Sequence, residues 1–502
     1  MNDRYSVENA PVKSKFLGKG TVIFLLAFIS LLAWSISTPV GGTPDEDFHL
    51  ASIWCGQGTR EAICESGSKL EERLVPQDLV FSAACYAFDP EKSADCQRSG
   101  FGTGSELIPT TRGNFNGLYP PVFYWVMSWF VSDDINSSVF GMRAFNSLIF
   151  LITLSASLIL LRGRQIAPPK VALFTLIPLG VFLIPSINPS SWAISACIGA
   201  YFATSAWLTQ KGKTKVFALT VTALMVLMAA GSRADAAVFV IISISSAFAI
   251  HASVSQLRKI TTYLPLAIST LFTALLVSAT GQVNVGANGL EGDAKSSVQG
   301  ITLLIVNFIQ APELWAGVFG YWGLGWLDTP MPTMVWVLGL LMFGYIVFSG
   351  FFTPDRRKKF TLLALLIALW VIPVVILTRS GLTVGAGVQP RYLLPLIAVA
   401  ASVAIEPIQN VAQGISAKFQ TNIFRVFLFF TFTISLFINF RRYESGIDVM
   451  NPNLFIQNDW SWPLAPPPMI IWLMASLCFA GTLYLLPFDE NSYHKKKLIK
   501  ID

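Results

Sequence analysis

The stretch Gly41-Gly42-Thr43-Pro44-Asp45-Glu46-Asp47-Phe48-His49 follows the first long apolar segment, at the point where the chain should leave the membrane. Its two glycines end the preceding helix. The threonine is a favoured helix N-cap, and the proline suits the first helical position, so a new helix should begin here. The spacing from Thr43 to Glu46 fits a capping box, in which the glutamate bonds back to the N-cap, so one interpretation of Glu46 is structural.

Asp45 has no such structural duty. It lies four residues before His49, so both side chains should project from one helix face at the membrane surface. The helix N-terminus beside them favours a negative charge. Asp45 and His49 are therefore the first candidate functional pair.

The composition is that of a membrane protein. The 502 residues are 53% hydrophobic and only 13% charged, and the mean hydropathy is +0.58. We expect an all-α polytopic membrane protein with roughly twelve spans, judged by the length and hydropathy of the apolar runs. These runs are 20–38, 138–161, 170–187, 191–209, 215–230, 236–252, 261–280, 333–352, 360–378, 391–405, 425–440 and 469–487. They define a transmembrane domain over 20–487, with a polar tail at 1–19 and a basic tail at 488–502.

Basic residues indicate how the spans are oriented. In a twelve-span arrangement the basic clusters all fall on one side, which the positive-inside rule assigns to the cytoplasm. Both termini are then cytoplasmic, and the long segments 39–137 and 281–332 face outward. The net charge of +6 therefore reflects anchoring at the inner leaflet, and no basic patch suggests nucleic acid. The clusters are Lys13, Lys15, Lys19; Arg162, Arg164; Lys211, Lys213, Lys215; Arg258, Lys259; Arg356, Arg357, Lys358, Lys359; and Lys495, Lys496, Lys497.

Four of the six cysteines lie in the segment 39–137, where an oxidising compartment would permit two disulfides. Loop length favours nearest-neighbour pairing, Cys55 with Cys64 and Cys85 with Cys96, among three possible pairings. Zinc is the rival interpretation, although no C-x-x-C spacing occurs among these four. The segment is also too long for a structureless connector, so it should fold as a large first extracytoplasmic loop.

Two arginines at expected span ends are candidates for phosphate binding. Arg391 lies at the top of an apolar helix, where a guanidinium offers planar donors; the alternative is an anchor at the membrane surface. Arg233 lies two residues before Asp235, so it either pairs with that carboxylate or binds substrate. The Gly-aromatic sequence that follows the amphipathic run 298–319 suits a lip at the bilayer surface; the alternative is simple interfacial anchoring.

With these features in view, the chain resembles the GT-C superfamily of membrane glycosyltransferases. The resemblance rests on the many spans, the acidic pair after the first span, the large first outer loop and the arginine at a late helix top. More narrowly, Pro44-Asp45-Glu46-x-x-His49, Tyr119-Pro120-Pro121 with Tyr124, and Arg391-Tyr392-Leu393-Leu394-Pro395 look like an uncharacterised bacterial family of predicted GT-C-like membrane proteins.

This resemblance implies transfer of a sugar from a polyprenyl-phosphate donor to a cell-envelope glycan or glycolipid, with inversion at the anomeric carbon. Asp45 would be the general base, with Glu46 and Asp47 as alternatives. His49 could orient Asp45, bind phosphate, or join Asp45 in binding a divalent cation, Mg²⁺ or Mn²⁺. The remaining substrate contacts would come from Arg391, Arg233, Tyr119, Tyr124 and Tyr392.

Two other functions compete with the glycosyltransferase. A transporter or flippase of a lipid-linked saccharide usually has internal repeats and broken helices near the membrane midplane. Here the ionisable candidates gather near one membrane face, and the sequence shows no half-to-half symmetry. A non-catalytic envelope assembly factor would not need the Asp45 carboxylate.

Overall fold

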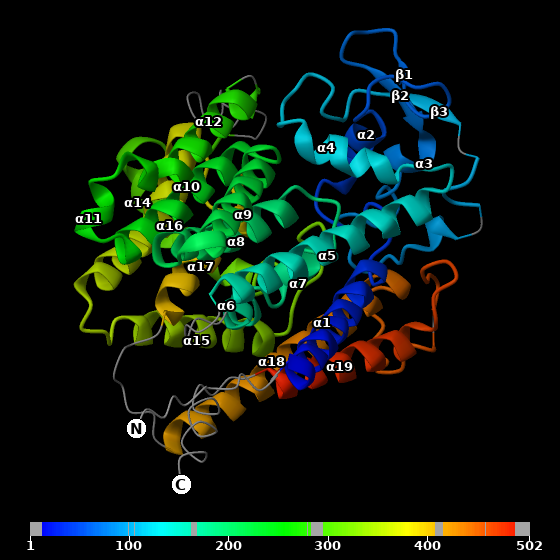
Figure 1. The fold of residues 1–502 in the computed structure, drawn as a ribbon. Helices are drawn as coiled ribbons and strands as arrows, with labels where there is room; N and C mark the ends of the chain where they lie inside the picture. Colours follow the sequence, from blue (N-terminus) through cyan, green and yellow to red (C-terminus); the bar gives the residue numbers. More distant parts are fainter. Residues whose placement is uncertain are drawn as a thin grey trace, which may run out of the picture.

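A computed structural model describes residues 13–98, 100–104, 106–161, 168–278, 280–282, 295–406, 415–456 and 458–486. The fold is mainly helical, with one small sheet and one domain of short elements beside a bundle of long helices (Figure 1). The expected tails lie largely outside the described residues; residues 13–19 belong to the first helix. The basic residues Arg162, Arg164, Lys495, Lys496 and Lys497 also lie outside the described part.

The elements of the first half of the chain are α1 (Lys13–Ile36), α2 (Glu46–Trp54), β1 (Glu65–Ser66), β2 (Arg73–Pro76), α3 (Gln77–Val80), η1 (Asp95–Gln97), β3 (Leu107–Thr110), α4 (Val122–Met127), η2 (Ser128–Phe130), α5 (Ile135–Leu160), α6 (Pro168–Thr175), α7 (Leu179–Leu183), α8 (Ser190–Thr209), α9 (Gly212–Ala230) and α10 (Ala234–His251). Those of the second half are α11 (Val254–Leu257), η3 (Ile260–Tyr263), α12 (Leu264–Val277), α14 (Gly300–Val318), α15 (Thr333–Gly350), α16 (Arg356–Ser380), α17 (Pro390–Ile405), α18 (Ile415–Glu444) and α19 (Pro468–Leu485).

Ten helices in the described residues are long and apolar enough to cross a membrane. The set differs from the twelve expected runs at four places. The run 170–187 forms two short helices, α6 and α7, separated around Pro178, because proline lacks the N–H that would continue a helix. The run 391–405 becomes α17, which has 16 residues and falls in the shorter class.

The third difference is α8, which has 20 residues but is not among the ten apolar helices. Nearly every one of its side chains is buried, and it packs against α5, α9, α10 and α17. Its serines, alanines and glycine allow such close packing, and a helix surrounded by other helices needs no lipid-facing side chains. The fourth difference is α14, which lies in the expected outer segment 281–332 and has the length and apolarity of a span.

The segment between α1 and α5 folds into a domain, as expected for the large first loop (Figure 1). Strand β2 pairs antiparallel with both β1 and β3, with Arg73 opposite Thr110. Disulfides join Cys55 to Cys64 and Cys85 to Cys96, which confirms the nearest-neighbour pairing. We refer to residues 37–134 as the outer domain, after the side of the membrane on which the sequence predicts this segment.

The end of α18 attaches the outer domain to the helix bundle. Arg442 is fully buried there; its Nη2 donates to the Tyr86 carbonyl at 2.6 Å and to Asp328 Oδ2 at 2.8 Å. The neighbouring Tyr443 hydroxyl donates to the Gly42 carbonyl at 2.7 Å. The Arg442 bonds join the outer domain to the bundle at Tyr86, and the Tyr443 bond holds the backbone shortly before α2.

Candidate active site

The first functional candidates lie where α2 begins. Asp45 is its N-cap, with a left-handed φ of 57°, and the helix proper starts at Glu46. The expected N-cap was Thr43, two residues earlier, so the helix starts later than the capping pattern predicts. Asp tolerates the left-handed conformation better than most residues, and such backbone outliers gather at functional sites.

Glu46 is buried in a structural clamp. Its Oε2 accepts hydrogen bonds from the Thr43 backbone N–H and hydroxyl, both at 2.9 Å, as the capping interpretation predicts. Arg143 Nη2 lies 2.9 and 3.0 Å from the two carboxylate oxygens, and neither side chain exceeds 1% exposure. The burial keeps Glu46 away from any substrate in this conformation and favours its structural role over a catalytic one.

Arg143, on α5, extends this clamp to the end of α1. Its two terminal nitrogens also donate to the carbonyls of Ser35, Thr38 and Pro39 at 2.6 to 2.8 Å. A helix end leaves such carbonyls without partners inside the helix, and the guanidinium satisfies them. Arg143 was not among the residues singled out from the sequence, because a single arginine in an apolar span carries no local signal of its partners.

Asp45 meets a different arginine. Arg391, in the first turn of α17, donates from Nη2 to Asp45 Oδ2 and to the Tyr392 hydroxyl, the latter at 3.1 Å. The Arg391 side chain is 4% exposed, and its Nε and Nη1 atoms have no hydrogen-bond partner among the described residues. The Asp45 side chain is 39% exposed. This pair therefore combines an accessible carboxylate with buried donors that lack acceptors.

The surroundings of Asp45 keep it ionised. Burial raises the pKa of this carboxyl, but the positive charges of Arg391 and Arg112 and the hydrogen bond from Arg391 outweigh it and hold the pKa below its ordinary value of 3.8. Above that pH the group is a carboxylate that can accept a proton. The same charges make it a modest base.

His49 lies one turn along α2 and is almost fully buried. Its Nδ1 is 3.0 Å from the Tyr124 hydroxyl of α4, and the edge of the Tyr119 ring packs against the imidazole at 5.7 Å. Burial, together with the nearby arginines, lowers the pKa of His49 to about 3. The imidazole is therefore neutral at physiological pH, and it orients the site rather than adding a positive charge.

Arg233 lies at the start of α10 and is held by a carboxylate. Its Nε and Nη2 each donate to Asp235 at 2.8 Å, and Nη1 donates to the Ser190 hydroxyl at 3.2 Å. The guanidinium stacks 4.4 Å above the Tyr392 ring, and the Arg391 guanidinium lies 5.1 Å from the same ring. Tyr392 thus contacts both arginines. The sequence left Arg233 either paired with Asp235 or free to bind substrate, and in the structure it is paired with Asp235.

Arg112 is a further charged residue that the sequence did not single out. It follows β3, and its Nε and Nη2 donate to the Asp47 carboxylate, with Nη2 to Oδ1 at 3.0 Å. The same Nη2 lies 3.6 Å from Asp45 Oδ1. Both Asp47 oxygens are therefore engaged, which favours Asp45 over Asp47 as the available base. A solitary arginine in a polar loop gives no signal by which the sequence could have found it.

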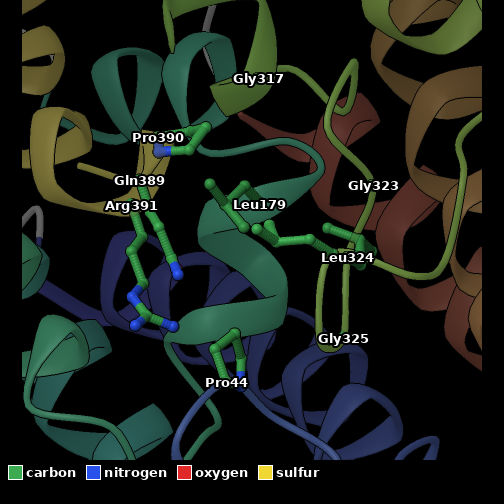
Figure 2. Close-up of a pocket in the computed structure, with 10 residues that line it drawn as sticks. Pro44, Leu179, Gly317, Gly323, Leu324, Gly325, Gln389, Pro390 and Arg391 are labelled. Carbon is green, nitrogen blue, oxygen red and sulfur yellow. The ribbon is translucent and has the colours of Figure 1, made fainter. Parts of the chain in front are cut away.

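A narrow pocket is lined by Arg391 and the residues around it (Figure 2). The Arg391 side chain extends from α17 toward Pro44, and Leu179 and Leu324 form part of the apolar lining beside it. The side-chain oxygen of Gln389, on the same wall, is buried and has no partner among the described residues. The space open to a water-sized molecule is about 10 Å³, roughly the volume that one water needs. A larger ligand requires this pocket to widen.

The possible divalent cation finds few ligands. Within the described ranges, no group of three or more His, Cys, Asp or Glu side chains is arranged to hold a metal ion. Asp45 is bonded to Arg391, and Nδ1 of His49 faces the Tyr124 hydroxyl. A site made of Asp45 and His49 alone would supply only two protein ligands to a cation. The positive charges beside Asp45 in this structure are the guanidinium groups of Arg391 and Arg112.

The site thus joins residues that are distant in sequence. Asp45, His49, Tyr119 and Tyr124 come from the outer domain, and Arg233, Arg391 and Tyr392 come from the helix bundle. A family model described as "Predicted membrane protein (DUF2142)" matches residues 28–400, which include all of these. No curated protein and no solved structure matches the chain.

Proposed function

The chain belongs to this DUF2142 family of predicted membrane proteins, and from that premise we propose that it is an integral membrane glycosyltransferase. It transfers a sugar from a polyprenyl-phosphate donor to an extracytoplasmic glycan or glycolipid of the cell envelope, with inversion at the anomeric carbon. Asp45 is the general base. The active site faces the outside of the cell membrane.

One observation carries this proposal: an accessible carboxylate touches a buried guanidinium that has unpartnered N–H groups. A buried donor without an acceptor costs about 1–3 kcal/mol, so proteins retain few of them unless a ligand completes the bonding. Arg391 has two such nitrogens, Nε and Nη1, beside an apolar pocket. A lipid phosphate has both parts that this arrangement lacks: anionic oxygens for the guanidinium and an apolar chain for the walls.

The reaction follows from these positions. The acceptor hydroxyl gives its proton to the Asp45 carboxylate as its oxygen attacks the anomeric carbon. The bond between that carbon and the phosphate oxygen breaks, and its electron pair leaves with the phosphate. Arg391 stabilises the negative charge on the departing polyprenyl phosphate. The products are the glycosylated acceptor and polyprenyl phosphate, and the proton on Asp45 is released to water.

Other residues of the site support this chemistry. Neutral His49 adds no positive charge beside Asp45. The half-buried Tyr119 ring offers an apolar face on which a sugar can stack, whereas the buried Tyr124 holds His49 through its hydroxyl. Tyr392 holds Arg391 through its hydroxyl. The Arg233 guanidinium is committed to Asp235, so its contribution to phosphate binding is through positive charge at a distance.

The test is transfer of radiolabelled sugar by purified protein in detergent. A panel of polyprenyl-phosphate-linked hexoses and pentoses serves as donor, and a cell-envelope fraction serves as acceptor. We expect Asp45→Asn to lower transfer by about 10²–10⁴-fold, the usual range for a general base, with unchanged expression, membrane insertion and donor binding.

The matched control is Asp133→Asn, which removes an exposed carboxylate from the same outer domain and should keep full activity. Retained transfer by Asp45→Asn would disprove the assignment of the base. A folded wild type that transfers no sugar from any donor and yet binds or moves the lipid would favour a transporter over a glycosyltransferase.

A further inference from the structure

The Asp45 carboxylate has one oxygen that is bonded and one that is not. Oδ2 accepts from Arg391, whereas no hydrogen bond to Oδ1 occurs among the described residues. Arg112 Nη2 lies 3.6 Å from Oδ1, which is close enough for charge attraction but too long for a hydrogen bond. Oδ1 is therefore the oxygen that remains for an acceptor hydroxyl.

Arg112 could close this opening. Its side chain is 51% exposed, so it has room to move. A shift of less than 1 Å would bring Nη2 within hydrogen-bond distance of Oδ1, because N–H to oxygen bonds are about 2.7–3.2 Å long. That bond would occupy the lone pair that must receive the acceptor's proton.

Asp47 holds Arg112 back. Two nitrogens of the guanidinium bond to the two oxygens of Asp47, whose side chain is only 14% exposed. This side-on geometry fixes the plane of the guanidinium as well as its distance. The position of Arg112 relative to Asp45 thus depends on the carboxylate two residues further along α2.

The backbone around Arg112 is anchored independently of this pair. Its N–H donates to the Thr110 hydroxyl at 3.1 Å, and the Asn114 N–H donates to the Ser52 hydroxyl of α2 at 2.8 Å. Asn114 also exchanges two hydrogen bonds with the backbone of Tyr119. Loss of the Asp47 carboxylate should therefore free the Arg112 side chain while the loop stays in place.

We propose that Asp47 is a positioning residue that keeps Arg112 away from Asp45 Oδ1 and thereby leaves the base open to the acceptor. This inference rests on the proposed glycosyltransferase function. Arg112 then marks the side from which the acceptor enters, opposite the buried Arg391 that faces the donor. The three consecutive acids have three separate roles: base, structural clamp and restraint on an arginine.

The experiment compares Asp47→Asn, Arg112→Gln and the double variant in the sugar-transfer assay. In Asp47→Asn the charged anchor is lost, Arg112 moves to Asp45, and kcat should fall by roughly tenfold, part of the usual contribution of a general base. The donor KM should change little, because Arg391 is untouched. The double variant should transfer at the rate of Arg112→Gln alone, since no guanidinium remains to block the base.

A pH profile adds a readout that a purely structural role would not move. Arg112→Gln removes a positive neighbour, so the pKa of Asp45 and the acid limb of the rate profile should shift upward. Asp47→Asn should shift that limb downward. Thermal unfolding of each purified variant, with Asp133→Asn as the control, separates these effects from loss of the fold.

Unchanged transfer in folded Asp47→Asn, or a double variant as slow as Asp47→Asn, would overturn the positioning role while leaving the glycosyltransferase intact. Absence of transfer by the wild type with every donor would instead overturn the proposed function, and this inference with it. The two failures are thus distinguished by the wild-type lane of the same assay.

Discussion

Glu46 and Asp45 are neighbours in sequence, yet each belongs to a different kind of arginine pair. Arg143 bonds to Glu46 and to three backbone carbonyls in a region closed to solvent, and only its Nε lacks a partner. Arg391 bonds to Asp45 and Tyr392 through one nitrogen and leaves Nε and Nη1 without partners.

The difference separates a structural pair from a candidate functional one. A buried charge pair is tolerated when its hydrogen bonds are complete, and the Glu46 pair comes close to this. The Asp45 pair is incomplete on both sides: an exposed carboxylate oxygen faces water, and buried N–H groups face a pocket. Incomplete bonding near a cavity is the physical sign of a site that a ligand completes.

The largest effect on stability should come from breaking the Glu46 pair. Glu46→Ala leaves Arg143 buried without its charge partner and should lower the free energy of unfolding by about 3–5 kcal/mol. Thermal unfolding in detergent measures this loss. The double variant Glu46→Leu/Arg143→Leu should recover part of it, because two apolar side chains replace the pair without an isolated charge. An equally stable Glu46→Ala would remove the contrast with Asp45.

A smaller effect, on activity, should follow from Arg391→Lys. Lysine keeps the charge but lacks the planar N–H groups at Nε and Nη1, so donor phosphate binding should weaken by about 10- to 100-fold in kcat/KM. Steady-state transfer over a range of donor concentrations measures it. The comparison variant is Arg143→Lys, which should affect stability far more than the donor KM. The reverse pattern would mean that Arg391 is the structural arginine.

The last effect is absent at neutral pH, develops only in acid, and separates His49 from both arginine pairs. Burial lowers its pKa from 6.5 to about 3, so the unfolded chain binds this proton first as the pH falls. The stability contributed by neutral His49 is complete above pH 6.5 and is lost as pH falls toward 3, by about 1.4 kcal/mol per pH unit. Chemical denaturation at several pH values should show this slope in the wild type and a shallower one in His49→Gln. Equal slopes would contradict a buried neutral histidine.

Local patterns in the sequence were sufficient for much of the site. Asp45 and His49 were found because a cap, a proline and a four-residue spacing occur together after an apolar run. The disulfides followed from loop length, and most spans from continuous hydropathy. Arg391 was predicted to be a phosphate-binding candidate because a charged side chain at the end of an apolar helix costs free energy unless it has a partner.

Other features depend on contacts that no local pattern carries. The capping pattern placed the start of α2 at Thr43, whereas the left-handed turn at Asp45 delays it. Helix α8 is not among the ten apolar helices although it has 20 residues, and neighbouring helices cover it; α17 is left out because it has only 16 residues. Arg112 and Arg143 were missed because each is a single residue whose partners lie 65 and 97 positions away.

The sequence by itself determined that this is a helical membrane protein and that an acidic, histidine-bearing turn follows its first span. These properties depend on composition and on spacings of a few residues, which hydropathy and helix geometry translate directly into structure. Only the tertiary structure decided which carboxylate meets which arginine, because residues 45, 46 and 47 pair with arginines 391, 143 and 112 from three separate segments. All three pairs join a carboxylate to a guanidinium, and they differ in how deeply the guanidinium is buried and in how many of its N–H groups are bonded.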